Sequence, residues 1–315
     1  MRFFAVWVYL AWRDALAKVA RSFLPLRRAQ NKTVCWLLRH GDYRWFLGLA
    51  ALSRWLRLSN RGERRRAFVA AANKQCLIND GRKVDFAKIS QRRRLLDLAA
   101  AYAGNAQLLA QLEHCQVQLN AVVEPLHRAG QPVVLAPLHM VSDVLAGMVG
   151  AGVFPGQATV VVSASAEVYQ ERTRQQAGIN LSYCSIHDDN RAIAGNLTSA
   201  IMAAADHQCN IMIFPDISPD YTVNTNEAKT AKLRCRLFDR PANLHSGVIR
   251  IARALSAQVV SYYLYYDQGI KIHIDPPIAA CNLKAKLSEL IETSIVRHPE
   301  DWLLWHSHSL FFINE

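Results

Sequence analysis

The sequence predicts an α/β fold in which a mainly parallel central sheet is flanked by helices and preceded by a basic, amphipathic helical N-terminal region. Short β-branched runs alternate with helical stretches from about residue 130 onward, as in βαβ units. Positive charge gathers earlier, because residues 1–115 hold 22 Lys and Arg against 7 Asp and Glu, and the other 200 residues hold 15 against 18. We therefore expect a basic helical region, 1–115, followed by an α/β domain, 116–315.

Apolar residues in the first region recur at helical spacing. The two stripes are Trp12, Leu16, Val19 and Phe23, and Trp45, Leu49, Leu52 and Leu56. Such a stripe is usually the core-facing side of a helix. The alternative is an interfacial helix among lipid headgroups, where the arginine clusters at 64–66 and 92–94 would contact anionic lipid. The basic residues could also be a solvated surface. No nucleic-acid-binding motif accompanies them, so we expect no nucleic-acid partner.

The sequence offers no clear membrane span and no cofactor motif. The uncharged run 3–12 is too short to cross a bilayer, and the run 144–166 is broken by glycines and by Pro155-Gly156. The seven cysteines form no CxxC pair, which favours reduced thiols over a zinc site. No glycine-rich phosphate loop is present. We expect a peripheral or monotopic protein that needs no cofactor.

The second region reads as alternating elements. The predicted strands are 133–136, 158–163, 179–184, 210–214, 259–266 and 270–274. The predicted helices are 143–150, 166–176, 192–206, 242–256 and 283–298. Ligands of such sheets bind at the carboxyl ends of the strands, and this is where we look for functional residues.

The first candidate site follows the strand at 133–136. His139 comes directly after the strand, and Asp143 lies four residues further, at the start of a helix. If Asp143 accepts one imidazole N–H, the other ring nitrogen of His139 can take a proton from a substrate hydroxyl. The alternative is a helix-capping Asp beside a structural histidine. Ser142 lies between them without a GxSxG elbow, which disfavours a serine hydrolase.

Two further features could reach the same sheet edge. Asp216 follows the strand at 210–214 in a Pro-Asp sequence, which an ordinary turn would also explain. A basic run comes next, and it could bind phosphate or carboxylate groups or form a solvated loop. Its members are Lys229, Lys232, Arg234 and Arg236. We assign Asp216 and these four residues to substrate binding.

The order of these motifs resembles the lipid A late-acyltransferase family, which comprises the lauroyl and myristoyl acyltransferases. The resemblance covers roughly residues 110–312 and depends on His139 with its nearby acid, Pro215-Asp216, Arg240-Pro241-Ala242 and the stretch from His298-Pro299-Glu300-Asp301-Trp302 to Trp305-His306. The family's signature has four residues between the His and the acid, whereas three intervene here. The family's Pro-Asp-Gln-Asp becomes Pro215-Asp216-Ile217-Ser218. These departures indicate a divergent branch, such as relatives that acylate the reducing-end glycan of a capsular polysaccharide.

The resemblance implies a glycerolipid-acyltransferase-like fold and transfer of a fatty acyl chain from an acyl thioester to a sugar hydroxyl. The donor would be acyl carrier protein or coenzyme A, and the acceptor a glycolipid or glycan. His139 and Asp143 would be the catalytic pair. The enzyme would work at the cytoplasmic face of a bacterial inner membrane, on its anionic surface. The displaced acid keeps two alternatives open, a non-catalytic lipid- or glycan-binding assembly factor and a thioesterase-like hydrolase.

Overall fold

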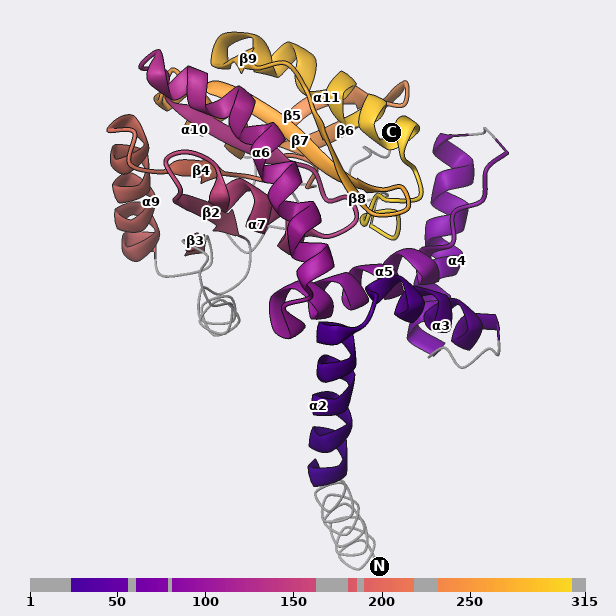
Figure 1. Cartoon of the computed structure of the whole chain (residues 1–315). Coiled ribbons are helices and arrows are strands. Elements are labelled where there is room, and N and C mark those ends of the chain that lie inside the picture. The colour runs from indigo at the N-terminus through magenta and orange to yellow at the C-terminus, as the bar shows by residue number, and fades with distance from the viewer. Residues whose placement is uncertain are drawn as a thin grey trace, which may run out of the picture.

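The structure is a computed structural model that describes residues 24–55, 61–78, 81–162, 181–185, 190–217 and 232–307. Its centre is a sheet in which seven strands are described, with the order β3-β2-β4-β1-β7-β8, and with β9 also paired to β7 (Figure 1). Strands β1 to β4 and β7 run parallel, and β8 and β9 run antiparallel to β7. This confirms the predicted α/β class with a mostly parallel sheet.

The strands have the following bounds. In the central sheet they are β1 (Val133–Pro137), β2 (Ala158–Val162), β3 (Leu181–Ser185), β4 (Asn210–Met212), β7 (Gln258–Tyr266), β8 (Ile270–Ile274) and β9 (Ile278–Ala279). A separate antiparallel hairpin consists of β5 (Lys232–Leu237) and β6 (Arg240–His245). Every residue of β1 is buried, as expected for a parallel strand covered on both faces.

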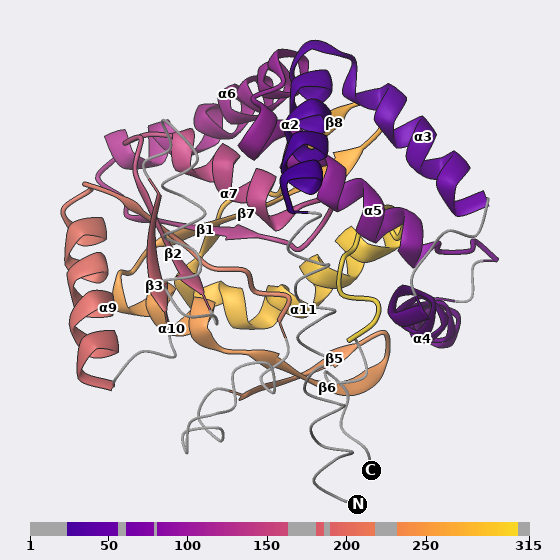
Figure 2. The ribbon, with the colours of Figure 1, turned by 90° about the horizontal axis from the view of Figure 1, so that it is seen from below.

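Helices cover both faces of the sheet (Figure 2). The face that carries α6 and α7 also receives residues of α2, α3 and η1, whereas α10 and α11 pack on the opposite face. Their bounds are α2 (Leu24–His40), α3 (Tyr43–Trp55), α4 (Arg61–Leu77), α5 (Phe86–Asp97), η1 (Leu98–Ala103), α6 (Ala106–Arg128), α7 (Asp143–Gly152), α9 (Asn190–Ala205), α10 (Gly247–Ala254) and α11 (Ala280–Arg297).

Helix α5 joins the two hydrophobic cores. Phe86 and Ile89 belong to the core on the α10 and α11 side, and Leu96 belongs to the core on the α6 and α7 side. The described part of residues 24–115 therefore packs against the sheet through both cores. This contact matters for the site, because α5 also reaches the loop that follows β1.

Most predicted elements are present, with one clear error. The helix predicted at 242–256 begins only at Gly247, and the residues before it form β6, whose side chains alternate between buried and more exposed positions. The first residues of the predicted helix, from Ala242 to His245, therefore lie in a two-stranded ribbon. The predicted helix at 166–176 and the stripe Trp12, Leu16, Val19 and Phe23 lie outside the described residues.

The described members of the second predicted stripe lie on the surface and not in the core, and its fourth member, Leu56, lies outside the described residues. Trp45, Leu49 and Leu52 share one face of α3 and are 77%, 60% and 52% exposed. Of the arginine cluster 92–94, only Arg94 is exposed, because Arg92 is buried and Arg93 is half-buried. No helix among the described residues has the length and apolar character needed to cross a bilayer.

Candidate active site

His139 lies just beyond the carboxyl end of β1. The strand pairs in parallel with β7 up to Pro137, and the Leu138 N–H donates to the Tyr262 carbonyl at 3.0 Å. On its other side β1 pairs with β4, and the Ile213 N–H donates to the Leu135 carbonyl at 3.0 Å. The residues that follow β1 and β4 therefore meet at one edge of the sheet, and this brings His139 and Asp216 together.

Asp216 holds His139 through both of its carboxylate oxygens. Oδ1 lies 2.7 Å from Nδ1 of the His139 ring, and Oδ2 accepts the backbone N–H of His139 at 2.9 Å. Oδ2 also accepts the indole N–H of Trp302 at 3.0 Å. Asp216 is 1% exposed. Its contacts in the structure are thus with His139 and Trp302, and the predicted substrate-binding role of Asp216 stays a prediction.

This geometry determines the protonation of the imidazole. A carboxylate only accepts hydrogen bonds, so the proton of neutral His139 must be on Nδ1, and Nε2 carries the lone pair. Within the described residues Nε2 has no hydrogen-bond partner, and the side chain is 15% exposed. The ring packs against Phe214 at 4.4 Å between centroids. His139 is thus arranged as a base with one reactive nitrogen available.

The electrostatic surroundings strengthen this base. Burial by itself would lower the pKa of His139, but the charge and hydrogen bond of Asp216 outweigh it, with a smaller contribution from the charge of Asp143. Arg93 acts in the opposite direction. The net effect raises the pKa of His139 above its ordinary value of 6.5. Asp216 therefore favours the imidazolium that forms when His139 takes a proton.

Asp143 does not hold the ring, contrary to the predicted pairing. Ser142 is the N-cap of α7 and accepts the Leu145 N–H, so the chain from His139 to Ser142 is a turn and not part of the helix. The four-residue spacing therefore does not place the His139 and Asp143 side chains on one helical face. Asp143 instead forms an ion pair with Arg93 of α5 at 2.5 Å.

Ser142 is also engaged, because its hydroxyl donates to Asp97 of α5 and accepts from Leu145. This dual bonding gives it a structural role at the helix start. The described geometry offers no histidine that would activate it. The disfavoured serine-hydrolase alternative gains no support from these contacts.

The turn that carries His139 is held tightly. Val141 has a φ of +57°, which is rarely adopted by a β-branched residue, and its N–H donates to the Asp301 carbonyl at 2.8 Å. The Leu303 N–H donates to the His139 carbonyl at 2.8 Å. Helix α7 behind the turn lies close to the sheet at Gly150, where a Cβ would come within 2.3 Å of Met212. A turn held by several hydrogen bonds in this way is typical of a site whose side chains must keep a fixed position.

The predicted basic residues lie on and before the β5–β6 hairpin. Lys232, Arg234 and Arg236 alternate along the exposed face of β5, while Leu233 and Leu237 face the core. Lys232 pairs in register with His245, whose N–H donates to the Ile217 carbonyl at 3.2 Å, next to Asp216. The Lys232 end is therefore the part of the hairpin nearest the site. Lys229 lies outside the described residues.

Two residues at the site were not predicted. Trp302 belongs to the C-terminal motif, but its hydrogen bond to Asp216 has no signature in the spacing of the chain. Arg93 was assigned to a lipid-binding cluster, yet its guanidinium pairs with Asp143 and lies within electrostatic range of His139. Its side chain remains 39% exposed. Arg93 is therefore a cation that a negatively charged or developing oxyanionic group at the site could approach.

A scan of the sequence against protein-family models finds no match, and a comparison with curated proteins finds no relative. The resemblance to the lipid A late acyltransferases therefore stays a hypothesis. Within the parts of the chain that the structure describes, no three His, Cys, Asp or Glu side chains gather as a metal site, and none of the seven cysteines forms a disulfide. The arrangement that remains is a buried Asp–His pair at the carboxyl edge of a parallel sheet.

Proposed function

We propose that the protein is an acyltransferase that moves a fatty acyl chain from an acyl thioester to a hydroxyl of a lipid-linked or reducing-end sugar. The observation that carries this proposal is the His139–Asp216 pair, with the proton on Nδ1 and Nε2 facing away from the carboxylate. An oriented imidazole with a raised pKa is the general base that activation of a hydroxyl requires.

In this mechanism Nε2 of His139 takes the proton of the acceptor hydroxyl while the hydroxyl oxygen forms a bond to the thioester carbonyl carbon. The C–S bond then breaks, and the departing thiolate takes the proton back from the imidazolium. Asp216 stabilises the imidazolium between these steps, as the acid of a Ser-His-Asp triad does. Arg93 is positioned to attract the oxyanion or a phosphate of the donor or acceptor. Asp143 keeps Arg93 in place.

The proposed setting is the cytoplasmic face of a bacterial inner membrane. The apolar face of α3, with Trp45, Leu49 and Leu52, would lie in the headgroup layer, which would explain why such large side chains are exposed. The exposed Arg65 and Arg66 of α4 would add attraction to anionic lipid. The acyl carrier protein is the proposed donor partner, and a glycolipid or capsular glycan is the proposed acceptor.

The test is to incubate the purified protein with acyl carrier protein that bears a radiolabelled acyl chain, together with membrane glycolipid extract. Label that moves into glycolipid, with release of the carrier thiol, supports the proposal. Label that appears as free fatty acid indicates a thioesterase. An absence of thiol release above the uncatalysed rate, in protein shown to be folded, would overturn the catalytic proposal and favour a binding factor.

A further inference from the structure

The C-terminal segment 298–307 lies across the turn that carries His139. Besides the two backbone hydrogen bonds from Val141 and Leu303, it forms an isolated antiparallel bridge between Met140 and Trp302. These contacts place the Trp302 indole over Asp216. Trp302 is 3% exposed, and its indole N–H reaches Oδ2 at 3.0 Å. The segment therefore touches both members of the pair, His139 by its backbone and Asp216 by a side chain.

We propose that Trp302 is a positioning residue for the His139–Asp216 pair, and that the ion pair between Arg92 and Asp301 holds it in place from helix α5. The indole N–H and the His139 backbone N–H share Oδ2, so they fix the plane of the carboxylate and leave Oδ1 for Nδ1 of the ring. Without the indole N–H of Trp302, the Asp216 carboxylate would rotate more freely about its Cβ–Cγ bond. This inference deepens the proposed function, but the arrangement of the pair does not depend on which reaction it serves.

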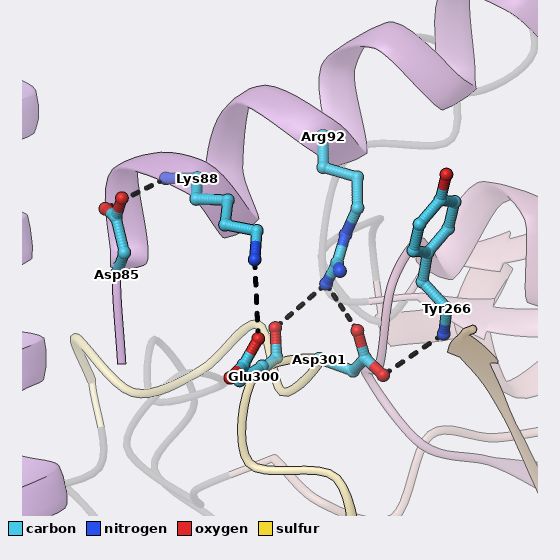
Figure 3. Close-up of polar contacts among 6 residues, drawn as sticks. All are labelled: Asp85, Lys88, Arg92, Tyr266, Glu300 and Asp301. Carbon is cyan, nitrogen blue, oxygen red and sulfur yellow. Dashed lines mark hydrogen bonds and ion pairs between the residues drawn. The ribbon is translucent and has the colours of Figure 1, made fainter. Parts of the chain in front are cut away.

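The anchor on α5 is visible in the contacts around Asp301 (Figure 3). The Arg92 guanidinium forms an ion pair with Oδ1 of Asp301 and donates to the Glu300 carbonyl at 2.8 Å. The Tyr266 N–H donates to Oδ2 of Asp301 at 3.2 Å, and Lys88 reaches Glu300 at 3.5 Å. The side chains of Arg92 and Asp301 are only 7% and 5% exposed. The residue immediately before Trp302 is thus held from both α5 and β7.

Helix α5 also holds the other end of the same turn. Arg93, the next residue, pairs with Asp143, and Asp97 accepts the hydroxyl of Ser142. Adjacent arginines therefore point to the two sides of the His139 turn, one to the C-terminal segment and one to α7. Packing of α5 against the sheet alone would not require ion pairs from both Arg92 and Arg93. Helix α5 therefore contacts both the His139 turn and the Trp302 segment and fixes their positions relative to each other.

The expected consequence of losing the indole donor follows from the charges around His139. The groups that act on the ring are Asp216, Asp143 and Arg93. The Trp302 N–H holds Oδ2 and so keeps Oδ1 directed at Nδ1 of the ring. Without it, the carboxylate can rotate away from Nδ1, the interaction that raises the pKa of His139 weakens, and that pKa should fall.

The test is a histidine NMR titration of the full chain labelled with ¹³C and ¹⁵N in its histidines, comparing the wild type with Trp302→Phe. The signal of His139 is assigned by its disappearance in His139→Asn. The expected result is a His139 pKa lower by about half a unit or more. The matched control is Trp305→Phe, because Trp305 is buried in the same segment but donates its indole N–H to the Pro299 carbonyl at 2.7 Å. Phe keeps an aromatic ring against the Trp302 ring, whose centroid lies 4.9 Å from that of Trp305. This control should leave the His139 pKa unchanged.

An unchanged or raised His139 pKa in folded Trp302→Phe, or equal shifts in both variants, would overturn the positioning role. If Trp302→Phe does not fold, Arg92→Lys supplies the second measurement. It keeps the charge but replaces the guanidinium, whose Nη2 contacts both Asp301 and the Glu300 carbonyl, by a more strongly hydrated ammonium. Arg92→Lys should lower the pKa of His139, and an unchanged pKa would contradict the anchoring role of Arg92. Because the readout is a pKa and not acyl transfer, it holds even if the proposed reaction is wrong. A failed acyl-transfer assay with a shifted pKa would reject the function and keep the positioning.

Discussion

Exchanging Asp216 for Asn should separate catalysis from folding. The amide oxygen can occupy the place of Oδ2 and keep the N–H groups of His139 and Trp302, while the amide nitrogen faces Nδ1 of the ring. That nitrogen is a donor, so Nδ1 must become the acceptor and the ring proton must move to Nε2. The base would then present a proton to the acceptor hydroxyl where it should present a lone pair.

The size of the effect of Asp216→Asn follows from the hydrogen bonds and the charge that the variant loses. Asp216 accepts three hydrogen bonds, and each becomes a neutral one in the variant. Hydrogen bonds to a charged group are worth about 1.5–3 kcal/mol and neutral ones about 0.5–1.5 kcal/mol, so the free energy of unfolding should fall by at most about 3–4 kcal/mol. Acyl transfer should fall about 100- to 10,000-fold, which is the usual contribution of a general base. Asp143→Asn breaks a partly exposed ion pair, so it should change stability by at most about 1 kcal/mol and transfer by less than about tenfold.

The assay is single-turnover transfer of labelled acyl chain to glycolipid, with urea unfolding of the same preparations. The pairing of Asp143 with His139 that the sequence predicts would instead make Asp143→Asn lose more acyl transfer than Asp216→Asn. A large loss of transfer in Asp143→Asn together with near-normal transfer in Asp216→Asn would refute the assignment of Asp216.

Three further predictions concern stability, pH and membrane binding. Arg92→Met leaves Asp301 buried without its counter-charge, so chemical unfolding should show a loss of about 3–5 kcal/mol, whereas the exposed Arg94→Met should stay within about 1 kcal/mol; equal effects would contradict the buried pair. The pKa of His139 is raised in the fold, so its interaction with Asp216 stabilises the protein below the unfolded value of about 6.5 and is lost as pH rises through the folded value. Transfer, which needs the neutral ring, should accordingly increase over that same rise in pH, and a rate that stays flat there would exclude His139 as the titrating base. Replacing Trp45 and Leu49 together by Ser should weaken co-flotation with anionic vesicles at least about tenfold, since each buried apolar side chain contributes about 1.5–3 kcal/mol, whereas Met202→Ser on α9 should have no effect; undiminished flotation would remove α3 from the membrane-binding surface.

The sequence was sufficient for the sheet because its strands carry their signal locally. β1 and β7 are short runs of apolar residues buried on both faces, and they appear close to their predicted bounds. The second half of β6 falls within the helix predicted at 242–256, and the alternating burial of its residues shows that it is a strand. The two-residue β9 is too short to leave a pattern in the sequence.

The site was predictable in its position but not in its pairing. His139 and Asp216 each follow a parallel strand, so both could be placed at one edge of the sheet. That β4 lies next to β1 is a fact of topology, and no local pattern reports it. Without it, the nearest acid in the sequence, Asp143, was the natural partner for His139. Arg92 shows the same limit, because its partner Asp301 is more than 200 residues away and a basic run alone gives no sign of burial.

The central claim is that Nε2 of His139 accepts the proton of an acceptor hydroxyl. It is tested most directly by the rate at which His139→Ala transfers a labelled acyl chain from acyl carrier protein to glycolipid, in protein whose folding is checked by circular dichroism. We predict a rate at least about 100-fold below that of the wild type. Transfer at the wild-type rate would contradict the claim and remove His139 from the mechanism.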